Sequence, residues 1–207
     1  MDEVWQALLS QWQSQSGLEL FAVALAIAYV WLATEESIWC WPAALISTSL
    51  YTFIYWDVSL LFQVLLNAYY AVMAVVGWLS WRQKPSSAVL LVSIMSTQQH
   101  LLFIASAGTC TALIYFFAAH WLSYEQLLLD ASITVFSLFT TFLTVRKKRA
   151  SWLYWIIINA ATVYLVVKAG LIFTALLMLI YIVIAIKGYW QWTQSMQAPR
   201  SVADSAV

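Results

Sequence analysis

Seven stretches of about 20 mostly apolar residues follow one another along this chain of 207 residues, separated by short polar or charged breaks. A helix that crosses the hydrocarbon core of a membrane needs about 20 such residues. Hydrophobic residues make up 64% of the chain and charged residues only 9%, which excludes an ordinary water-soluble globular protein. We therefore predict seven membrane-spanning helices, near residues 18–34, 38–55, 60–81, 100–120, 127–145, 152–168 and 171–192.

Two further segments are apolar but too short to span. The first seventeen residues lack the basic start of a secretory signal, so we expect no cleavage there. One helical face of this segment predicts a short helix on the membrane surface, formed by Val4, Trp5, Leu8, Leu9 and Trp12. Residues 88–99 are interrupted by hydroxyl and amide side chains, and we expect them to form an interfacial connector into the fourth span.

Basic residues fall almost entirely on one side of the predicted membrane. With seven spans, the breaks after the first, third and fifth spans and the C-terminus share a side. That side holds eight of the nine lysines and arginines, namely Arg82, Lys84, Arg146, Lys147, Lys148, Arg149, Lys187 and Arg200, and the other holds Lys168. Because loops rich in Lys and Arg stay in the cytoplasm, we predict an outside N-terminus and a cytoplasmic C-terminus, with the run 146–149 acting chiefly as a topology determinant.

The chain contains an internal repeat at an interval of 111 residues. This shift aligns Trp41 with Trp152, Phe62 with Phe173, Leu65 with Leu176, Tyr70 with Tyr181, Ala74 with Ala185, Gly77 with Gly188 and Trp81 with Trp192. The match covers three spans in each half, so the fourth span must return the chain to the face where the second half begins. We predict an all-α membrane protein with two parallel three-helix repeats joined by a linker helix, a 3+1+3 arrangement found in SWEET-type transporters.

The predicted organisation has five parts. An N-terminal interfacial segment covers 1–17, the first three-helix bundle 18–81, a cytoplasmic connector with the linker helix 82–126, the second bundle 127–192, and a C-terminal tail 193–207. Transporters of this type bind substrate near the midplane, between the halves. A bundle whose duplication carries no function is the alternative interpretation.

Polar side chains inside the spans gather on three helical faces. Such groups are costly in hydrocarbon and usually face the interior of a bundle. The faces are Asn67, Tyr70, Ala74 and Gly77 on the third span, Asp130, Thr134, Ser137 and Thr141 on the fifth, and Trp152, Trp155 and Asn159 on the sixth. Amides, aromatic faces and one carboxylate together suit a small, flat, cationic ring system. For Asn67 and Asn159, a hydrogen bond between helices explains the residue equally well.

Signals of enzymatic or coupled chemistry are missing from the sequence. It contains no phosphate-binding loop of the GxxxxGK[ST] type, no HExxH and no GxSxG, so we expect no catalytic residues, metal or cofactor. Cys40 and Cys110 lie singly in apolar stretches and are interpreted as small core residues. Nine basic and nine acidic residues cancel, which gives no reason to expect a nucleic-acid partner. Without a basic residue in mid-span, a facilitator is favoured over a coupled pump.

Three segments carry a resemblance to a known family: Asn67 to Trp81, Asp130 to Lys147, and Trp152 to Asn159. Together they resemble the nicotinamide riboside transporter family, the PnuC-type vitamin transporters, over about Leu18 to Trp192. The resemblance implies a homotrimer in the bacterial inner membrane that takes up a vitamin precursor by facilitated diffusion, with trapping by phosphorylation inside the cell. The partners implied are the vitamin and the lipid bilayer.

The resemblance also implies site residues. Trp152, Trp155 and Asn159 match the family's binding motif on the sixth span, Asn67 and Tyr70 its contacts on the third, and Asp130 an acidic residue that opens the fifth. Thr134, from the polar face of the fifth span, completes the candidate substrate-binding set.

Three departures from the family pattern lie in or near this set. The family usually has Gln at Asn67, an aromatic residue at Val76, and Glu-Asn at Ala150 and Ser151. They leave the fold intact but open the choice of substrate, with nicotinamide riboside first and thiamine second. A membrane scaffold without a substrate is the alternative from another class.

Overall fold

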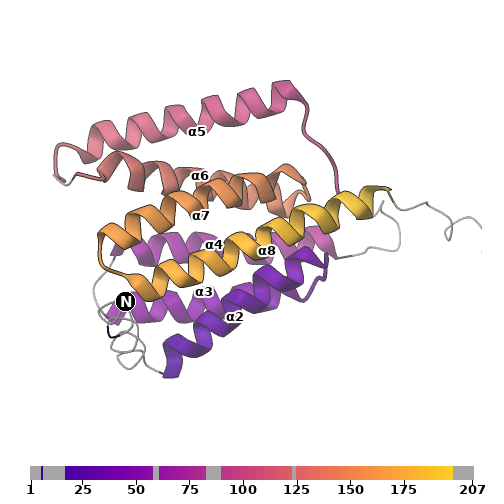
Figure 1. The fold of residues 1–207 in the computed structure, drawn as a ribbon, viewed down its shortest axis with the longest axis horizontal. Coiled ribbons are helices and arrows are strands. Elements are labelled where there is room, and N and C mark those ends of the chain that lie inside the picture. Colours follow the sequence, from indigo (N-terminus) through magenta and orange to yellow (C-terminus); the bar gives the residue numbers. More distant parts are fainter. Residues whose placement is uncertain (1–5, 7–16, 58–60, 83–89, 123–124, 198–207) are drawn as a thin grey trace, which may run out of the picture.

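Long helices make up nearly all of the computed structural model, which describes residues 6, 17–57, 61–82, 90–122 and 125–197 (Figure 1). The described helices are α2 (Gly17–Thr34), α3 (Cys40–Asp57), α4 (Leu61–Trp81), α5 (Thr97–Ala118), α6 (Leu127–Val145), α7 (Ala150–Lys168) and α8 (Ile172–Gln197). The all-helical class is confirmed, and each helix coincides with one predicted span. The surface helix expected within the first seventeen residues lies outside the described residues.

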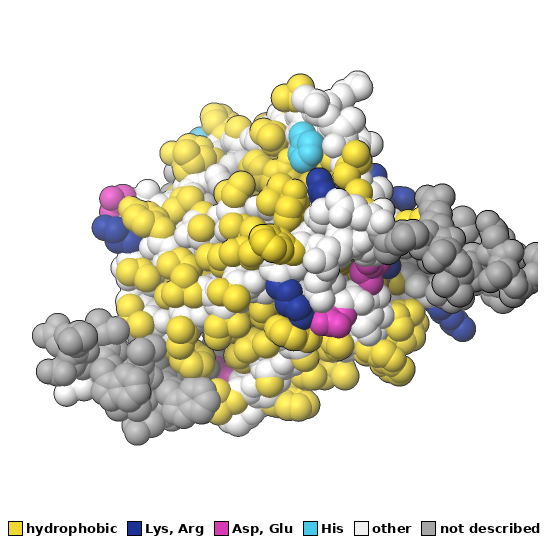
Figure 2. Space-filling model, turned by 45° about the vertical axis from the view of Figure 1, so that its right-hand side comes forward, with side chains coloured by type: hydrophobic (Ala, Val, Ile, Leu, Met, Phe, Trp, Pro, Cys, Tyr) yellow, Lys and Arg dark blue, Asp and Glu magenta, His cyan; other side chains and the backbone are white. Residues whose placement is uncertain are grey.

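Six of the described helices are long and apolar enough to cross a membrane: α2, α4, α5, α6, α7 and α8. The exception, α3, has the same 18-residue length as α2 but is less apolar, because it carries Ser47, Thr48, Ser49 and Thr52. Figure 2 shows hydrophobic side chains spread over the visible flank of the molecule, with charged side chains grouped in a few places. Large apolar residues such as Leu102, Phe117 and Val183 are exposed, as expected of a surface that faces lipid.

The helices form a closed ring. Around it, α2 packs against α3, α3 against α4, α4 against α6, α6 against α7, α7 against α8, and α8 against α2. Among the described residues, no other two helices of the ring approach each other at the backbone, so the side chains facing inward meet in the middle. The seventh helix, α5, packs against α6, contacts Tyr154 of α7 through His100 and Phe103, and lies outside the ring, at the upper edge of Figure 1.

Local geometry recurs at the interval of 111 residues. Glu36 and Lys147 both have a left-handed backbone, with φ of 53° and 48°. Matching hydrogen bonds close the two turns, from Ser37 N to Leu32 O at 3.0 Å and from Lys148 N to Leu143 O at 2.9 Å. We call α2–α4 repeat 1 and α6–α8 repeat 2.

A tryptophan packs onto a glycine at equivalent places in both repeats. The ring of Trp41 lies against Gly77, and that of Trp152 lies against Gly188. A Cβ atom added at either glycine would collide with the indole ring. These contacts explain why the Trp and Gly matches stand out in the sequence. Each tryptophan needs a glycine opposite it, because any side chain there would occupy the place of the indole ring.

One end of the ring carries most of the described basic residues, and we call it the basic end. There α2, α4 and α6 finish, α3 and α7 begin, and the run 146–149 forms the turn between α6 and α7. The described part of the connector joins this end: Ser93 N donates to Lys147 O and Arg149 N donates to Ser93 O, each at 3.0 Å. The connector leads into α5 as expected, but it is tied to repeat 2 by backbone hydrogen bonds.

Candidate functional site

Four tryptophans form a row across the interior at the basic end, which we call the tryptophan row. Its members are Trp41, Trp81, Trp192 and Trp152, each no more than 8% exposed. Trp41 meets Trp81 edge to face at 5.1 Å, Trp152 meets Trp192 at 5.3 Å, and Trp81 lies 6.1 Å from Trp192 between the repeats. Buried edge-to-face pairs at these distances are favourable beyond the area they bury.

Hydrogen bonds from the two central tryptophans tie the repeats together. The indole N–H of Trp81 donates to the carbonyl of Val145 at 2.9 Å, and that of Trp192 donates to the carbonyl of Ala33 at 3.1 Å. Each bond runs from the third helix of one repeat to the end of the first helix of the other. The tryptophan row therefore joins the two repeats at the basic end, and each repeat donates one hydrogen bond to the other.

An ion pair lies beside the tryptophan row. Lys147 Nζ is 2.7 Å from Glu36 Oε2, and the two side chains are only 10% and 23% exposed. The same ammonium group lies 4.5 Å from the ring centre of Trp81, within range of a cation–π interaction. Lys147, which the sequence analysis grouped with its basic neighbours, thus also has a structural partner in Glu36. Glu36 and Lys147 meet because they occupy equivalent turns that the ring brings together.

A second, more exposed ion pair joins the turn after α2 to α8. Lys187 of α8 contacts Glu35 at 2.8 Å and lies 3.2 Å from the ring centre of Trp31. The hydrogen bond from Lys187 holds the pKa of the Glu35 carboxyl below its usual value. Repeat 1 and repeat 2 are therefore linked at the basic end by two lysine–glutamate pairs.

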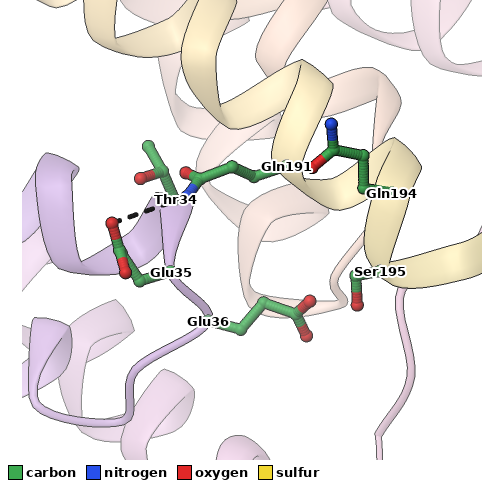
Figure 3. A pocket seen from close by; sticks show the side chains of 6 residues that line it. All are labelled: Thr34, Glu35, Glu36, Gln191, Gln194 and Ser195. Atoms are coloured by element: carbon green, nitrogen blue, oxygen red, sulfur yellow. Dashed lines mark hydrogen bonds between the residues drawn. The ribbon is translucent and has the colours of Figure 1, made fainter. Parts of the chain in front are cut away.

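An open pocket of about 370 Å³ lies next to these ion pairs. Figure 3 shows its lining, which comes from the end of α2, the following turn and the last turns of α8: Thr34, Glu35, Glu36, Gln191, Gln194 and Ser195. Carboxylates and amides make this pocket polar and acidic, although the residues around it are basic.

Three half-buried tyrosines, Tyr29, Tyr70 and Tyr181, lie near one another on α2, α4 and α8, and we call them the tyrosine cluster. Tyr70 and Tyr181 precede Trp81 and Trp192 by eleven residues, or about three helical turns, so they face the same way, about 16 Å further along α4 and α8. Half the hydrocarbon thickness is about 15 Å, which puts this level near the midplane. Tyr29 of α2 lies close enough to both phenols to interact with them electrostatically.

The structure brings the predicted faces of the third and fifth spans together. The hydroxyl of Tyr70 lies close enough to Ser137 to interact with it, and the hydroxyl of the neighbouring Tyr69 donates to Leu138 O at 2.8 Å. Asn67 is buried on the same face of α4, one turn before Tyr70. Counted from the basic ends of their helices, Tyr70, Thr134 and Asn159 lie at similar depths of about 14 to 16 Å.

The predicted residues of the sixth span have different surroundings. Trp152 belongs to the tryptophan row and packs on Gly188, as Trp41 packs on Gly77. Trp155 donates its indole N–H to Thr144 Oγ1 at 3.1 Å, and Asn159 is buried two turns beyond Trp152. Trp152 lies at the basic end and Asp130 in the first turn of α6, at the far end. The seven predicted residues are therefore spread from the basic end to the far end of the ring and do not meet in a single pocket.

Sequence reasoning missed several interior groups. Tyr181 had a signal, because it aligns with Tyr70 in the repeat, but Tyr29 is a single aromatic residue in an apolar helix and had none. Cys40 is fully buried in the core at the basic end, as expected, and Cys110 is half-buried; both are free thiols. Within the described residues, no group of His, Cys, Asp and Glu has the arrangement of a metal site.

Comparison with known proteins identifies the family. A family model described as nicotinamide mononucleotide transporter matches residues 16–194. The chain belongs to the nicotinamide mononucleotide transporter family. It is similar to the nicotinamide riboside transporter PnuC of Neisseria mucosa, with 25% identity over 202 residues. The match covers 91% of this chain and 76% of that protein.

A solved structure agrees with the fold of this family member. The crystal structure of the vitamin B3 transporter PnuC matches it with a TM-score of 0.71 at 24% identity, over 93% of this chain and 87% of that one. The predicted resemblance to PnuC-type transporters is thus confirmed, and with it a multi-pass membrane fold. The family and its relative are named for different solutes, a nucleotide and a nucleoside, and the interior side chains bear on that choice.

Proposed function

We propose that the chain takes up nicotinamide riboside by facilitated diffusion, and that phosphorylation inside the cell traps the product. The observation that carries this proposal is the ring interior near the midplane, where the tyrosine cluster and the buried amides of Asn67 and Asn159 lie at similar depths along their helices. Nicotinamide riboside is a flat pyridinium cation with a carboxamide and ribose hydroxyls. Aromatic faces attract such a cation, and amides hydrogen-bond its polar groups.

The charges along the chain favour the nucleoside over the nucleotide. In the part of the chain that the structure describes, lysines and arginines lie near the basic end or, for Lys168, at the end of α7, and none lies at the level of the tyrosine cluster. A phosphate group brought to that level would have no cationic partner, which makes its burial costly. A pyridinium ring requires no basic partner.

Transport would proceed by rocking one bundle, 18–81, against the other, 127–192, around this fixed site, with 82–126 as the link. In the described state the basic end is closed by the tryptophan row and the Glu36–Lys147 pair. Opening must separate these contacts, because they join the two bundles. We place the basic end in the cytoplasm, the N-terminus outside, and the protein as a homotrimer in the bacterial inner membrane.

Thiamine is the second candidate, because two of the three departures from the family pattern fall beside the interior, whereas the third, Val76, is exposed. Asn67 shares its helical face with Tyr70, and Ser151 precedes Trp152 of the tryptophan row. Thiamine also carries a cationic aromatic ring, so the same aromatic surfaces would suit it.

Uptake into reconstituted vesicles tests the proposal. Labelled nicotinamide riboside should enter until its concentrations inside and outside are equal, and an uncoupler should leave the initial rate unchanged. A nucleoside kinase with ATP inside the vesicles should convert equilibration into accumulation. Collapse of entry with the uncoupler would contradict facilitated diffusion, entry of thiamine alone would favour the second candidate, and entry of neither would favour a scaffold.

A further inference from the structure

Two tyrosine rings lie stacked on α3, in the half of the ring remote from the basic end. Tyr51 and Tyr55 are one helical turn apart, and their ring centres are 5.7 Å apart at an angle of 18° between the planes. Counted from the start of α3 at Cys40, Tyr51 lies about 16 Å from the basic end and Tyr55 about 22 Å. Tyr51 is thus level with Tyr70 and Tyr181, and Tyr55 lies one turn nearer the far end.

The stacked pair faces the interior of the ring. Tyr51 is close enough to Tyr181 to interact with it electrostatically, although α3 and α8 make no backbone contact with each other among the described residues. Helix α2 packs against both and stands between them, so the two phenols approach each other on the inner side of α2. Tyr55 shares the inward face of α3, because it follows Tyr51 by four residues.

A carboxylate lies beside the stacked pair. Glu19, in the first turn of α2, is close enough to interact electrostatically with both Tyr51 and Tyr55. It lies about 22 Å from the end of α2 at Thr34, which is the depth of Tyr55. The carboxylate, the stacked phenols and the tyrosine cluster therefore form one continuous surface, which runs from the far end to the level of the midplane.

This surface is accessible, whereas the interior at the basic end is sealed. Glu19, Tyr51 and Tyr55 are half-buried, as are the three members of the tyrosine cluster. Every member of the tryptophan row is at most 8% exposed. A side chain that faces inward stays partly exposed only where its neighbours leave the interior unfilled, so the far half of the ring has room beside these rings.

Charges among the described residues would draw a cation to this end. Four acidic residues lie at the far end, against Lys168 as its lysine: Glu19, Asp57, Glu125 and Asp130. The basic end carries six lysines and arginines against two glutamates within the same described ranges. Clefts lined by one sign of charge raise the local concentration of solutes of the opposite sign.

We propose that Glu19, Tyr51 and Tyr55 form a subsite that selects the cationic ring of the solute in the far half of the ring. The solute ring lies against the phenols within range of a cation–π interaction, and the carboxylate balances its charge. This inference rests on the proposed function and deepens it, since it assigns the choice of a charged solute to particular residues. At the interval of 111 residues, Thr162 and Val166 stand in place of the two tyrosines, so repeat 1 alone provides the stacked rings.

Replacing Glu19 by Gln tests the subsite, because it removes the charge and keeps the shape. The two solutes to compare are nicotinamide riboside and its dihydro form, whose ring has nearly the same shape but no charge. In calorimetric titration of the purified protein, Glu19→Gln should weaken the binding of nicotinamide riboside by about tenfold. The affinity for the dihydro form should stay within about twofold, because a neutral ring gains little from the carboxylate.

Tyr55 provides a second test with its own conservative variant. Tyr55→Leu removes the ring and should weaken the binding of nicotinamide riboside by about fivefold, the effect of one cation–π contact. Tyr55→Phe keeps the aromatic face and should bind nicotinamide riboside as the unaltered protein does.

Asp57→Asn is the matched control. Asp57 is exposed at the end of the same helix and follows Tyr55 by two residues, which places it on about the opposite side of α3. The variant removes a negative charge from the far end without altering the inward face. Its affinity for nicotinamide riboside should therefore stay within about twofold.

Several results would overturn the subsite. Unchanged affinity for nicotinamide riboside in Glu19→Gln would do so, as would equal losses for the two solutes, which indicate a structural role. An equal loss in Asp57→Asn would mean that only the overall charge of the far end matters. If the unaltered protein bound the charged solute but not the neutral one, the comparison of Glu19→Gln with Asp57→Asn would decide. If it bound neither, the proposed function would fail first, and the two failures are thereby distinguished.

Discussion

Breaking the Glu36–Lys147 ion pair should open the basic end. Replacement of Glu36 by Gln leaves the Lys147 ammonium buried without its counterion, at 10% side-chain exposure. Removing one partner of a fully buried pair costs about 3 to 5 kcal/mol. Since the Glu36 side chain is 23% exposed and Lys147 keeps its contact with Trp81, we expect a cost of about 2 kcal/mol to the closed state. That cost raises the ratio of open to closed molecules by about 30-fold.

Cys40 provides the assay for this opening. Its thiol is 0% exposed at the start of α3, four residues beyond Glu36, so it should react only when the basic end opens. The chain has two cysteines, and Cys110→Ser leaves Cys40 as the single thiol. With a small neutral maleimide under conditions where closing is faster than labelling, the labelling rate follows the open population. Glu36→Gln should therefore label about 30 times faster than its parent.

Two further variants make the test specific. Glu35→Gln breaks the more exposed pair with Lys187, which solvent screens, and should raise labelling far less. The exchanged pair Glu36→Lys with Lys147→Glu should restore slow labelling, because the attraction is kept with its direction reversed. An unchanged rate at Cys40 in a folded Glu36→Gln protein would refute the reasoning, as would failure of the exchanged pair to protect.

Three other changes have defined outcomes. Gly77→Ala and Gly188→Ala should each lower the free energy of unfolding by about 1 to 3 kcal/mol, because the new methyl group meets Trp41 or Trp152. Gly108→Ala is the control, because its methyl group enters open space and should not lower the unfolding temperature. Trp155→Ala should weaken nicotinamide riboside binding by on the order of 1 to 2 kcal/mol in calorimetry, with exposed Trp190→Ala as control; equal affinities would contradict an aromatic contact. In competition assays, nicotinamide mononucleotide should displace the nucleoside poorly, and equal potency would refute the charge argument.

The helices could be predicted from the sequence because lipid imposes a minimum apolar length. The predicted fifth span coincides with α6 at both ends, whereas α8 continues to Gln197, five residues past its predicted end. Hydropathy marks where a helix leaves the apolar layer, and the polar residues Thr193, Gln194 and Ser195 stay helical beyond that point. The repeat was visible for a physical reason too, since Trp41 with Gly77 and Trp152 with Gly188 are mutually constrained contacts.

The interior was harder to predict because it depends on how the helices are arranged around the ring. Glu36 and Lys147 look like loop charges in the sequence, and only the ring brings their turns together. Helical periodicity placed Trp152 and Asn159 on one face correctly but could not show that the tryptophan packs on Gly188 near one end.

Calorimetric titration of the purified protein with nicotinamide riboside tests the central claim most directly. The account predicts saturable binding of one solute molecule per chain, abolished in Asn159→Ala and absent for nicotinamide mononucleotide at the same concentrations. The account would be contradicted if the folded protein gave no heat with nicotinamide riboside, whether it bound thiamine or neither solute.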